Sequence, residues 1–134
     1  MKNQPPELKR IERFVIEYPR SDLGRKDWNK RFSLNSIYSG KPRNERRGDA
    51  NEWHSICAAA MLKAKIPKKP FCKPVKVTFY WNDGLDVDNH AYMGKMIVDG
   101  MKGWLLSDDT KRYFKQVTHA FHSENYILVE VAEI

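Results

Sequence analysis

The segment from Val75 to Lys102 changes its periodicity midway, and this change constrains the fold more than any other feature. From Val75 to Trp81, apolar and polar residues alternate, which is typical of a half-buried strand. From about Asn89 to Lys102, apolar residues recur at helical spacing, and Gly103 is a typical C-terminal stop. The sequence therefore predicts a strand that leads into a helix through a short link rich in aspartate.

Further strands and one more helix are expected around this unit. Alternating patterns predict strands over residues 11–18, 111–121 and 126–131. Residues 122–125 are expected to form a hairpin turn between the last two strands. A helix is predicted over 51–65, because Asp49 and Glu52 resemble a capping box. The order β-α-β-α-β-β predicts a small α+β domain with a mixed sheet and helices packed on one face.

The 134 residues fit a single domain spanning 1–134, because two independent cores are hard to build from so short a chain. Residues 1–10 are expected to be flexible. Residues 19–48 are polar and basic, which predicts a long basic loop with at most one short helical turn near 35–38. Two cysteines make no disulfide framework, and no apolar run can span a bilayer. These features predict a cytoplasmic protein without a membrane partner.

The balance of charge indicates a polyanionic partner. Lys and Arg number 24 against 17 Asp and Glu, which gives a formal net charge of +7. A modest excess of lysine is common, but clustered basic residues favour nucleic acid because they attract phosphates together. The expected DNA-binding residues are Lys41, Arg43, Arg46, Arg47, Lys68 and Lys69.

The link between the central strand and helix concentrates carboxylates. Asp86 and Asp88 lie two residues apart, so in an extended stretch both can face one cation, and carboxylate oxygens suit Mg²⁺. Alone, such a stretch is more often a polar turn that caps a helix. Two further features favour a metal site. Lys95 lies on the same helical face as Asp88, and a second acidic pair, Asp108 and Asp109, follows the helix.

Other kinds of site fit the sequence less well. An EF-hand loop that starts at Asp86 requires Gly at Ala91 and Glu at Ile97. A different magnesium phosphotransferase is an alternative class, but the chain has no glycine-rich nucleotide loop, so no organic cofactor is expected. His90, in the first helical turn, is expected to be structural or solvated.

The chain resembles the RusA-type Holliday junction resolvases in its combined motifs: Leu85-Asp86-Val87-Asp88-Asn89, Lys95, Asp99-Gly100-Met101-Lys102-Gly103 and Asp108-Asp109. Residues 33–38 also resemble a Pro-Ser-x-Asn-x-x-Tyr segment of phage-borne members, although Phe32 replaces the proline. The resemblance covers most of the chain from residue 33 onward. One departure is that Lys95 follows Asp88 by two helical turns instead of one.

The resemblance implies a RusA-like fold and a homodimeric hydrolase, a crossover junction endodeoxyribonuclease that uses Mg²⁺, or Mn²⁺ in its place. Its substrate would be the four-way DNA junction of recombination and repair. Asp86, Asp88 and Asp109 would bind the metal, with Asp108 as a further candidate ligand, and Lys95 would be the catalytic lysine. The alternative is a catalytically inactive accessory protein of the same fold that binds junctions. The lengths of the helix and link leave open whether Asp109 joins the other two carboxylates within one subunit or from the second.

Overall fold

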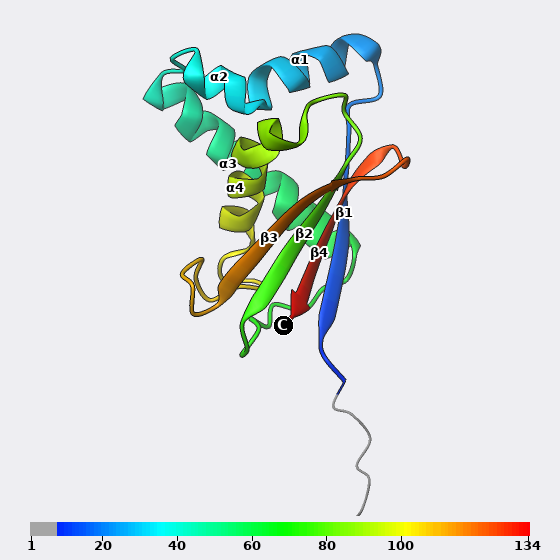
Figure 1. Cartoon of the computed structure of the whole chain (residues 1–134), viewed down its shortest axis with the longest axis vertical. Coiled ribbons are helices and arrows are strands. Elements are labelled where there is room, and N and C mark those ends of the chain that lie inside the picture. Colours follow the sequence, from blue (N-terminus) through cyan, green and yellow to red (C-terminus); the bar gives the residue numbers. More distant parts are fainter. Residues whose placement is uncertain (1–7) are drawn as a thin grey trace, which may run out of the picture.

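Four strands form one mixed sheet in the order β1-β4-β2-β3 (Figure 1). The computed structural model describes residues 8–134, so most of the segment 1–10, predicted to be flexible, lies outside the described residues. The strands are β1 (Ile11–Glu17), β2 (Val75–Trp81), β3 (Phe114–Phe121) and β4 (Tyr126–Glu133). Strand β4 pairs antiparallel with both β1 and β2, whereas β3 runs parallel to β2. The predicted mixed sheet of a small α+β domain is confirmed.

Two long helices cover one face of this sheet, as predicted (Figure 1). They are α3 (Arg43–Lys63) and α4 (Ala91–Met101), and α4 continues directly from a short 3₁₀ helix, η1 (Val87–His90). Two more helices, α1 (Asp22–Phe32) and α2 (Leu34–Tyr38), lie across one end of the sheet. Within residues 8–134, no helix combines the length and apolar character needed to cross a membrane.

The core lies between the sheet and the helices α3 and α4. Alternate residues of β2 and β4 point into it, and both helices contribute apolar side chains at helical spacing. The residues with no exposed surface include Trp53, Cys57, Met61, Val77, Phe79, Met93, Ile97 and Val129. The helices approach each other closely at Gly100, where an added Cβ would lie 2.9 Å from the Cβ of Cys57. Cys57 is therefore a core residue.

The prediction of a long loop over 19–48 is wrong, because α1, α2 and the start of α3 occupy most of it. Ser21 caps α1, since its Oγ accepts a hydrogen bond from the backbone N–H of Gly24 at 2.9 Å. Helix α1 packs through Trp28 and Phe32, whose ring centroids lie 5.0 and 5.3 Å from that of Trp53. These two aromatic side chains take the place of the longer stripe of apolar residues from which a helix is usually predicted. The short helical turn expected near 35–38 falls within α2.

Helix α3 begins at Arg43, about two turns before the predicted start, so the capping box at Asp49 and Glu52 is also wrong. Asp49 lies inside the helix and is only 4% exposed. Its carboxylate forms an ion pair with Lys41 and accepts a 2.7 Å hydrogen bond from the hydroxyl of Tyr92. The acidic residue that resembled a cap therefore ties the start of α3 to α4.

The predicted hairpin between β3 and β4 is wrong, because these strands flank β2 and do not pair with each other. The link 122–125 crosses the end of β2 instead. There the N–H of His122 donates to the carbonyl of Trp81 at 3.2 Å, and the side chain of Asn82 donates to the carbonyl of Glu124 at 2.9 Å. A polar four-residue link suits a hairpin locally, but the pairing of β2 with strands on both sides decides the topology.

Candidate active site

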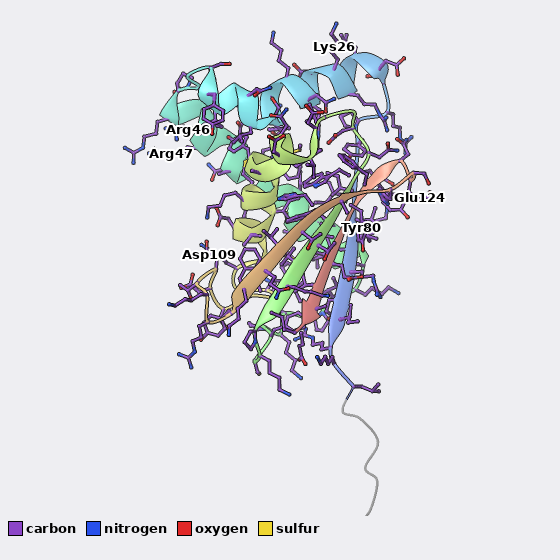
Figure 2. The ribbon with its side chains drawn as sticks, viewed as in Figure 1. Lys26, Arg46, Arg47, Tyr80, Asp109 and Glu124 are labelled. Carbon is purple, nitrogen blue, oxygen red and sulfur yellow. The ribbon has the colours of Figure 1, made fainter. Side chains whose placement is uncertain are left out.

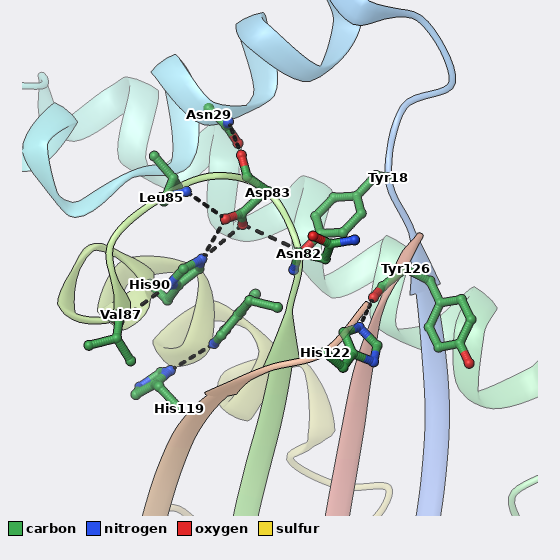
Figure 3. Close-up of polar contacts among 11 residues, drawn as sticks. Tyr18, Asn29, Asn82, Asp83, Leu85, Val87, His90, His119, His122 and Tyr126 are labelled. Atoms are coloured by element: carbon green, nitrogen blue, oxygen red, sulfur yellow. Dashed lines mark hydrogen bonds and ion pairs between the residues drawn. The ribbon is translucent and has the colours of Figure 1, made fainter. Parts of the chain in front are cut away.

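A buried pair of side chains holds the aspartate-rich link between β2 and α4 in place (Figure 3). Nε2 of His90 lies 2.8 and 2.9 Å from the two carboxylate oxygens of Asp83, and Nδ1 lies 3.2 Å from the carbonyl of Val87. The side chains of His90 and Asp83 are 0% and 3% exposed. His90 is therefore structural, which was one of its two expected roles.

Further hydrogen bonds fix the same link to β1 and α1. The amide of Asn29 donates to the carbonyl of Asp83 at 2.7 Å, and the backbone N–H of Asn82 donates to the hydroxyl of Tyr18 at 2.8 Å. Burial raises the pKa of Tyr18 well above its ordinary value, so this hydroxyl stays protonated. The link has a fixed path because it is bound to its neighbours from several sides.

Asp86 and Asp88 point away from this anchored core. Both are exposed, and Asp86 has the extended backbone of an N-cap residue, with φ −65° and ψ 156°. In the described part of the chain, no hydrogen bond or ion pair engages either carboxylate. No three His, Cys, Asp or Glu side chains within residues 8–134 come close enough together to hold one metal ion. Asp86, Asp88 and Asp109 therefore do not converge within the described part of one subunit.

Lys95 and Asp109 do come together, on the exposed side of α4. The Lys95 ammonium lies 3.1 Å from Oδ2 of Asp109 and 3.1 Å from Oδ1 of Asp99. Lys102 approaches the same two carboxylates at 3.1 and 3.3 Å. Hydrogen bonds from Lys95 and Lys102 lower the pKa of Asp109 to about 2. Asp108 is turned aside, because its Oδ1 accepts a hydrogen bond from the backbone N–H of Asp109 at 2.8 Å.

A tight turn follows α4, and Asp109 lies in the loop between α4 and β3, near the C-terminal end of the helix (Figure 2). Gly103 has φ +80°, a conformation that favours glycine, and the indole N–H of Trp104 donates to the carbonyl of Ile66 at 3.0 Å. The 11 residues of α4 span about 16 Å, and Lys95 follows Asp88 by about 10 Å along the axis. Asp109 thus lies beside Asp99, where the ammonium groups of both Lys95 and Lys102 reach it, and it does not reach Asp88.

A groove of about 370 Å³ runs between α4 and β3, next to this ion pair. The residues that line it include Gly94, Lys95, Val98, Asp109, Val117 and His119. The ring of His119 is half-buried, and its Nδ1 accepts a 3.0 Å hydrogen bond from the indole N–H of Trp81. Burial, with the nearby His90, lowers the pKa of His119. No sequence motif predicted a role for His119, although the alternation of β3 places it on the same side as Val117.

The basic residues expected to bind DNA lie in three different settings. Arg43, Arg46 and Arg47 are exposed on the first turns of α3, where Figure 2 labels two of them. The Lys41 side chain is only 9% exposed, because it is paired with Asp49. Lys68 and Lys69 are exposed beyond the other end of α3, whose 21 residues span about 30 Å. The exposed basic residues thus form two separate clusters.

A scan against protein-family models and a search of curated proteins found no match to the chain. What the site can do follows from its own chemistry. An exposed pair of carboxylates lies at the N-terminal end of α4, and a lysine–aspartate pair lies two turns further on. Such a face offers oxygen ligands to a hard cation and an ammonium group to a phosphate.

Proposed function

We propose that this chain is a magnesium-dependent, structure-selective endodeoxyribonuclease of the RusA type that resolves four-way DNA junctions as a homodimer. The observation that carries the proposal is the exposed face of the continuous η1–α4 segment, where Asp88 of η1 and Lys95 of α4 are two turns apart and Lys95 contacts Asp109 at 3.1 Å. The resemblance in sequence motifs supports the choice of a junction as substrate. Two-fold symmetry of a dimer matches the two-fold symmetry of a four-way junction.

The donor chemistry of this face fits Mg²⁺. Mg²⁺ is often held by one or two carboxylates, while waters and substrate phosphate oxygens complete its coordination. Asp86 and Asp88 are exposed and, among residues 8–134, have no competing cation partner, so they are the first candidates. When bound, Mg²⁺ or Mn²⁺ lowers the pKa of a water and stabilises charge on the attacking and leaving oxygens. Asp109, with its low pKa, remains ionised and is the third candidate ligand.

Lys95 has the position and mobility for a second role. Its side chain is 62% exposed, so its ion pairs with Asp99 and Asp109 are surface contacts that it can exchange for a phosphate oxygen. An ammonium beside the scissile phosphate neutralises charge that develops during phosphodiester hydrolysis. When Lys95 turns to DNA, Asp109 loses one of its two lysine partners and becomes available to a cation. The second subunit is the other source of a third carboxylate.

Exposed basic residues at the two ends of α3 are proposed to hold the DNA backbone. Arg43, Arg46 and Arg47 form one cluster, and Lys68 and Lys69 form the other. Phosphate contacts of this kind position a duplex without reading its bases, which suits recognition of a branched shape. Lys41 is left out of this surface because Asp49 engages it.

The direct test is cleavage of a labelled four-way junction with and without Mg²⁺. We expect cutting by the native chain only with the metal, and a loss of at least about 100-fold in Asp88→Asn. Asp27→Asn, which removes an exposed carboxylate on α1, is the matched control and is expected to cut normally. Undiminished cutting by Asp88→Asn would overturn the site, and equal cutting of linear duplex would remove the junction claim.

A junction-binding accessory protein without cleavage is the second candidate. The observation in its favour is that Asp109 is already neutralised by Lys95 and Lys102. Tight binding of the junction with no cutting in either Mg²⁺ or Mn²⁺ would favour this function over the nuclease.

A further inference from the structure

His119 lies in the groove between α4 and β3, in close contact with the glycine opposite it, Gly94. A Cβ at Gly94 would lie 3.0 Å from Cε1 of His119 and 3.3 Å from the ring of Phe79. The imidazole therefore rests on the backbone of α4, one residue before Lys95. Strand β3 also contacts η1 at this end of the groove. His119 thus lies beside the face of α4 that carries Asp88 and Lys95.

The hydrogen bond from Trp81 defines which nitrogen of His119 carries a proton. Because the indole N–H donates to Nδ1 at 3.0 Å, Nδ1 presents a lone pair, and the neutral ring must carry its proton on Nε2. Burial lowers the pKa of His119, which keeps the ring neutral near neutral pH. Trp81 is itself fixed, since it stacks on His90 with centroids 4.3 Å apart and His90 is bound to Asp83 (Figure 3).

This tautomer restricts the chemistry that His119 can perform. A protonated Nε2 cannot ligate a metal or accept a proton, but it can donate a hydrogen bond. In the described part of the chain, no group accepts a hydrogen bond from Nε2. Lys95 lines the same groove. The groove therefore contains a neutral hydrogen-bond donor, Nε2–H of His119, and a cation, the ammonium group of Lys95. Both groups suit an anionic oxygen.

We propose that Nε2–H of His119 donates a hydrogen bond to a non-bridging oxygen of the scissile DNA phosphate, which lies in the α4–β3 groove beside Lys95. The inference deepens the proposed nuclease function and rests on it for the identity of the phosphate. The apolar side chains of Val98 and Val117 give the groove walls that can contact the adjoining deoxyribose. Trp81 is a positioning residue, because it acts on the phosphate only through the tautomer of His119.

A matched pair of substitutions separates the donor from the rest of the ring. The amide of Gln lies as far along the side chain as Nε2, whereas that of Asn lies as far as Nδ1. His119→Gln therefore keeps a donor toward the groove, and His119→Asn keeps only an acceptor for Trp81. We expect His119→Asn to lower kcat about 10- to 100-fold without changing KM, and His119→Gln to restore most of that loss. His122→Asn, on the link beyond β3, is the control and is expected to cut normally.

Trp81→Phe tests the positioning role. Phenylalanine can retain the stacking on His90, but it removes the N–H that holds Nδ1 of His119 as an acceptor. We expect a smaller loss of kcat than in His119→Asn, together with a mixture of the two ring tautomers. The tautomers are measured by nitrogen NMR of the histidine ring. A single Nε2-protonated tautomer in Trp81→Phe would overturn this role of Trp81.

A measurement without cleavage completes the test. In native protein without Mg²⁺, we expect the ring NMR spectrum to show His119 protonated on Nε2 only, and this N–H signal to shift when a four-way junction is added. A proton on Nδ1, or a signal that the junction leaves unmoved, would overturn the proposal. Normal cutting by His119→Asn would also overturn it while the nuclease stands. A shifted signal in a protein that never cuts would remove the nuclease function and keep the phosphate contact.

Discussion

The two ends of α4 carry carboxylates in opposite electrostatic states. At the N-terminal end, Asp86 and Asp88 are exposed and, among residues 8–134, face no cationic side chain. At the C-terminal end, Asp109 lies between the ammonium groups of Lys95 and Lys102, each 3.1 Å away. The first end is open to a cation from solution, and the second already has its charge balanced by the chain itself.

This difference shows that burial and neighbours, not residue type, decide what each aspartate does. Asp83 is three residues from Asp86, but it is buried and bound by His90 at 2.8 Å. It stabilises the link, and Asp86 and Asp88 remain available for function because Asp83 holds the backbone beneath them. A buried structural pair therefore fixes the backbone that carries the exposed pair, Asp86 and Asp88.

Removing the buried pair is expected to have the largest effect. His90→Ala leaves the buried Asp83 without its main partner and removes the ring that stacks on Trp81. We expect the free energy of unfolding to fall by about 3–5 kcal/mol, measured by urea denaturation. His122→Ala is the matched control at a partly exposed position and should cost less than about 1 kcal/mol. An equal cost for both would show that the contact between His90 and Asp83 does not stabilise the link that carries Asp86 and Asp88.

The next effect concerns the C-terminal end of α4, where this helix contacts α3. Gly100→Ala places a Cβ 2.9 Å from Sγ of Cys57, so α4 must shift away from α3. We expect a loss of about 1–3 kcal/mol in the free energy of unfolding. Gly48→Ala, on an open face of α3, meets no atom within 4 Å and should be neutral or stabilising by up to about 1 kcal/mol. Equal effects of both substitutions would contradict the close approach.

A third test separates the two ends by metal binding. At a Mg²⁺ concentration about ten times Kd, we expect the native chain to gain about 1.4 kcal/mol of stability, and EDTA to remove this gain. Asp88→Asn should abolish it, whereas Asp109→Asn should keep most of it because Asp109 is paired with lysines. The readout is the shift in thermal unfolding with Mg²⁺. Equal loss in both variants would mean that the two ends act as one metal site.

The smallest effect is the pH dependence of the stability that Asp109 contributes through its ion pairs with Lys95 and Lys102. The pKa of Asp109 falls from 3.8 to about 2 in the folded chain, so its contribution to stability is present above the unfolded value and is lost as pH falls through the folded one. The group is near the surface, so we expect under about 1 kcal/mol. The difference in unfolding free energy between native chain and Asp109→Asn should be present at about pH 6 and gone by about pH 2. A difference that does not change with pH would contradict the ion pairs.

Periodicity alone predicted the elements whose contacts are regular. Strands β1, β2 and β4 and helix α4 bury alternate or helically spaced apolar residues, so their positions could be predicted within a few residues. Helix α1 could not be predicted in this way, because it depends on Trp28 and Phe32 packing against a residue far along the chain. The pairing of β3 with β2 could not be predicted for the same reason, because these strands are far apart in the sequence.

The candidate site shows the same division. The sequence predicted Lys95 and Asp109 as members of one site, and the fold brings these two together but not with Asp86 and Asp88. Asp49 was misinterpreted as a cap, because only the folded chain shows that Lys41 and Tyr92 bind its carboxylate. The proposed role of His119 depends on its hydrogen bond with the indole of Trp81, and no local pattern in the sequence predicts that contact.

The interior position of β4 has a consequence for how the chain acquires its structure during synthesis. Ile11 pairs with Ala132, and Val77 pairs with Val131, so the last strand joins two segments that a ribosome releases much earlier. A nascent chain that stops before residue 126 leaves β1 and β2 as unpaired edges, and such edges promote aggregation. The sheet can therefore close only after β4 has been synthesised, and pairing over so long a separation predicts slow folding.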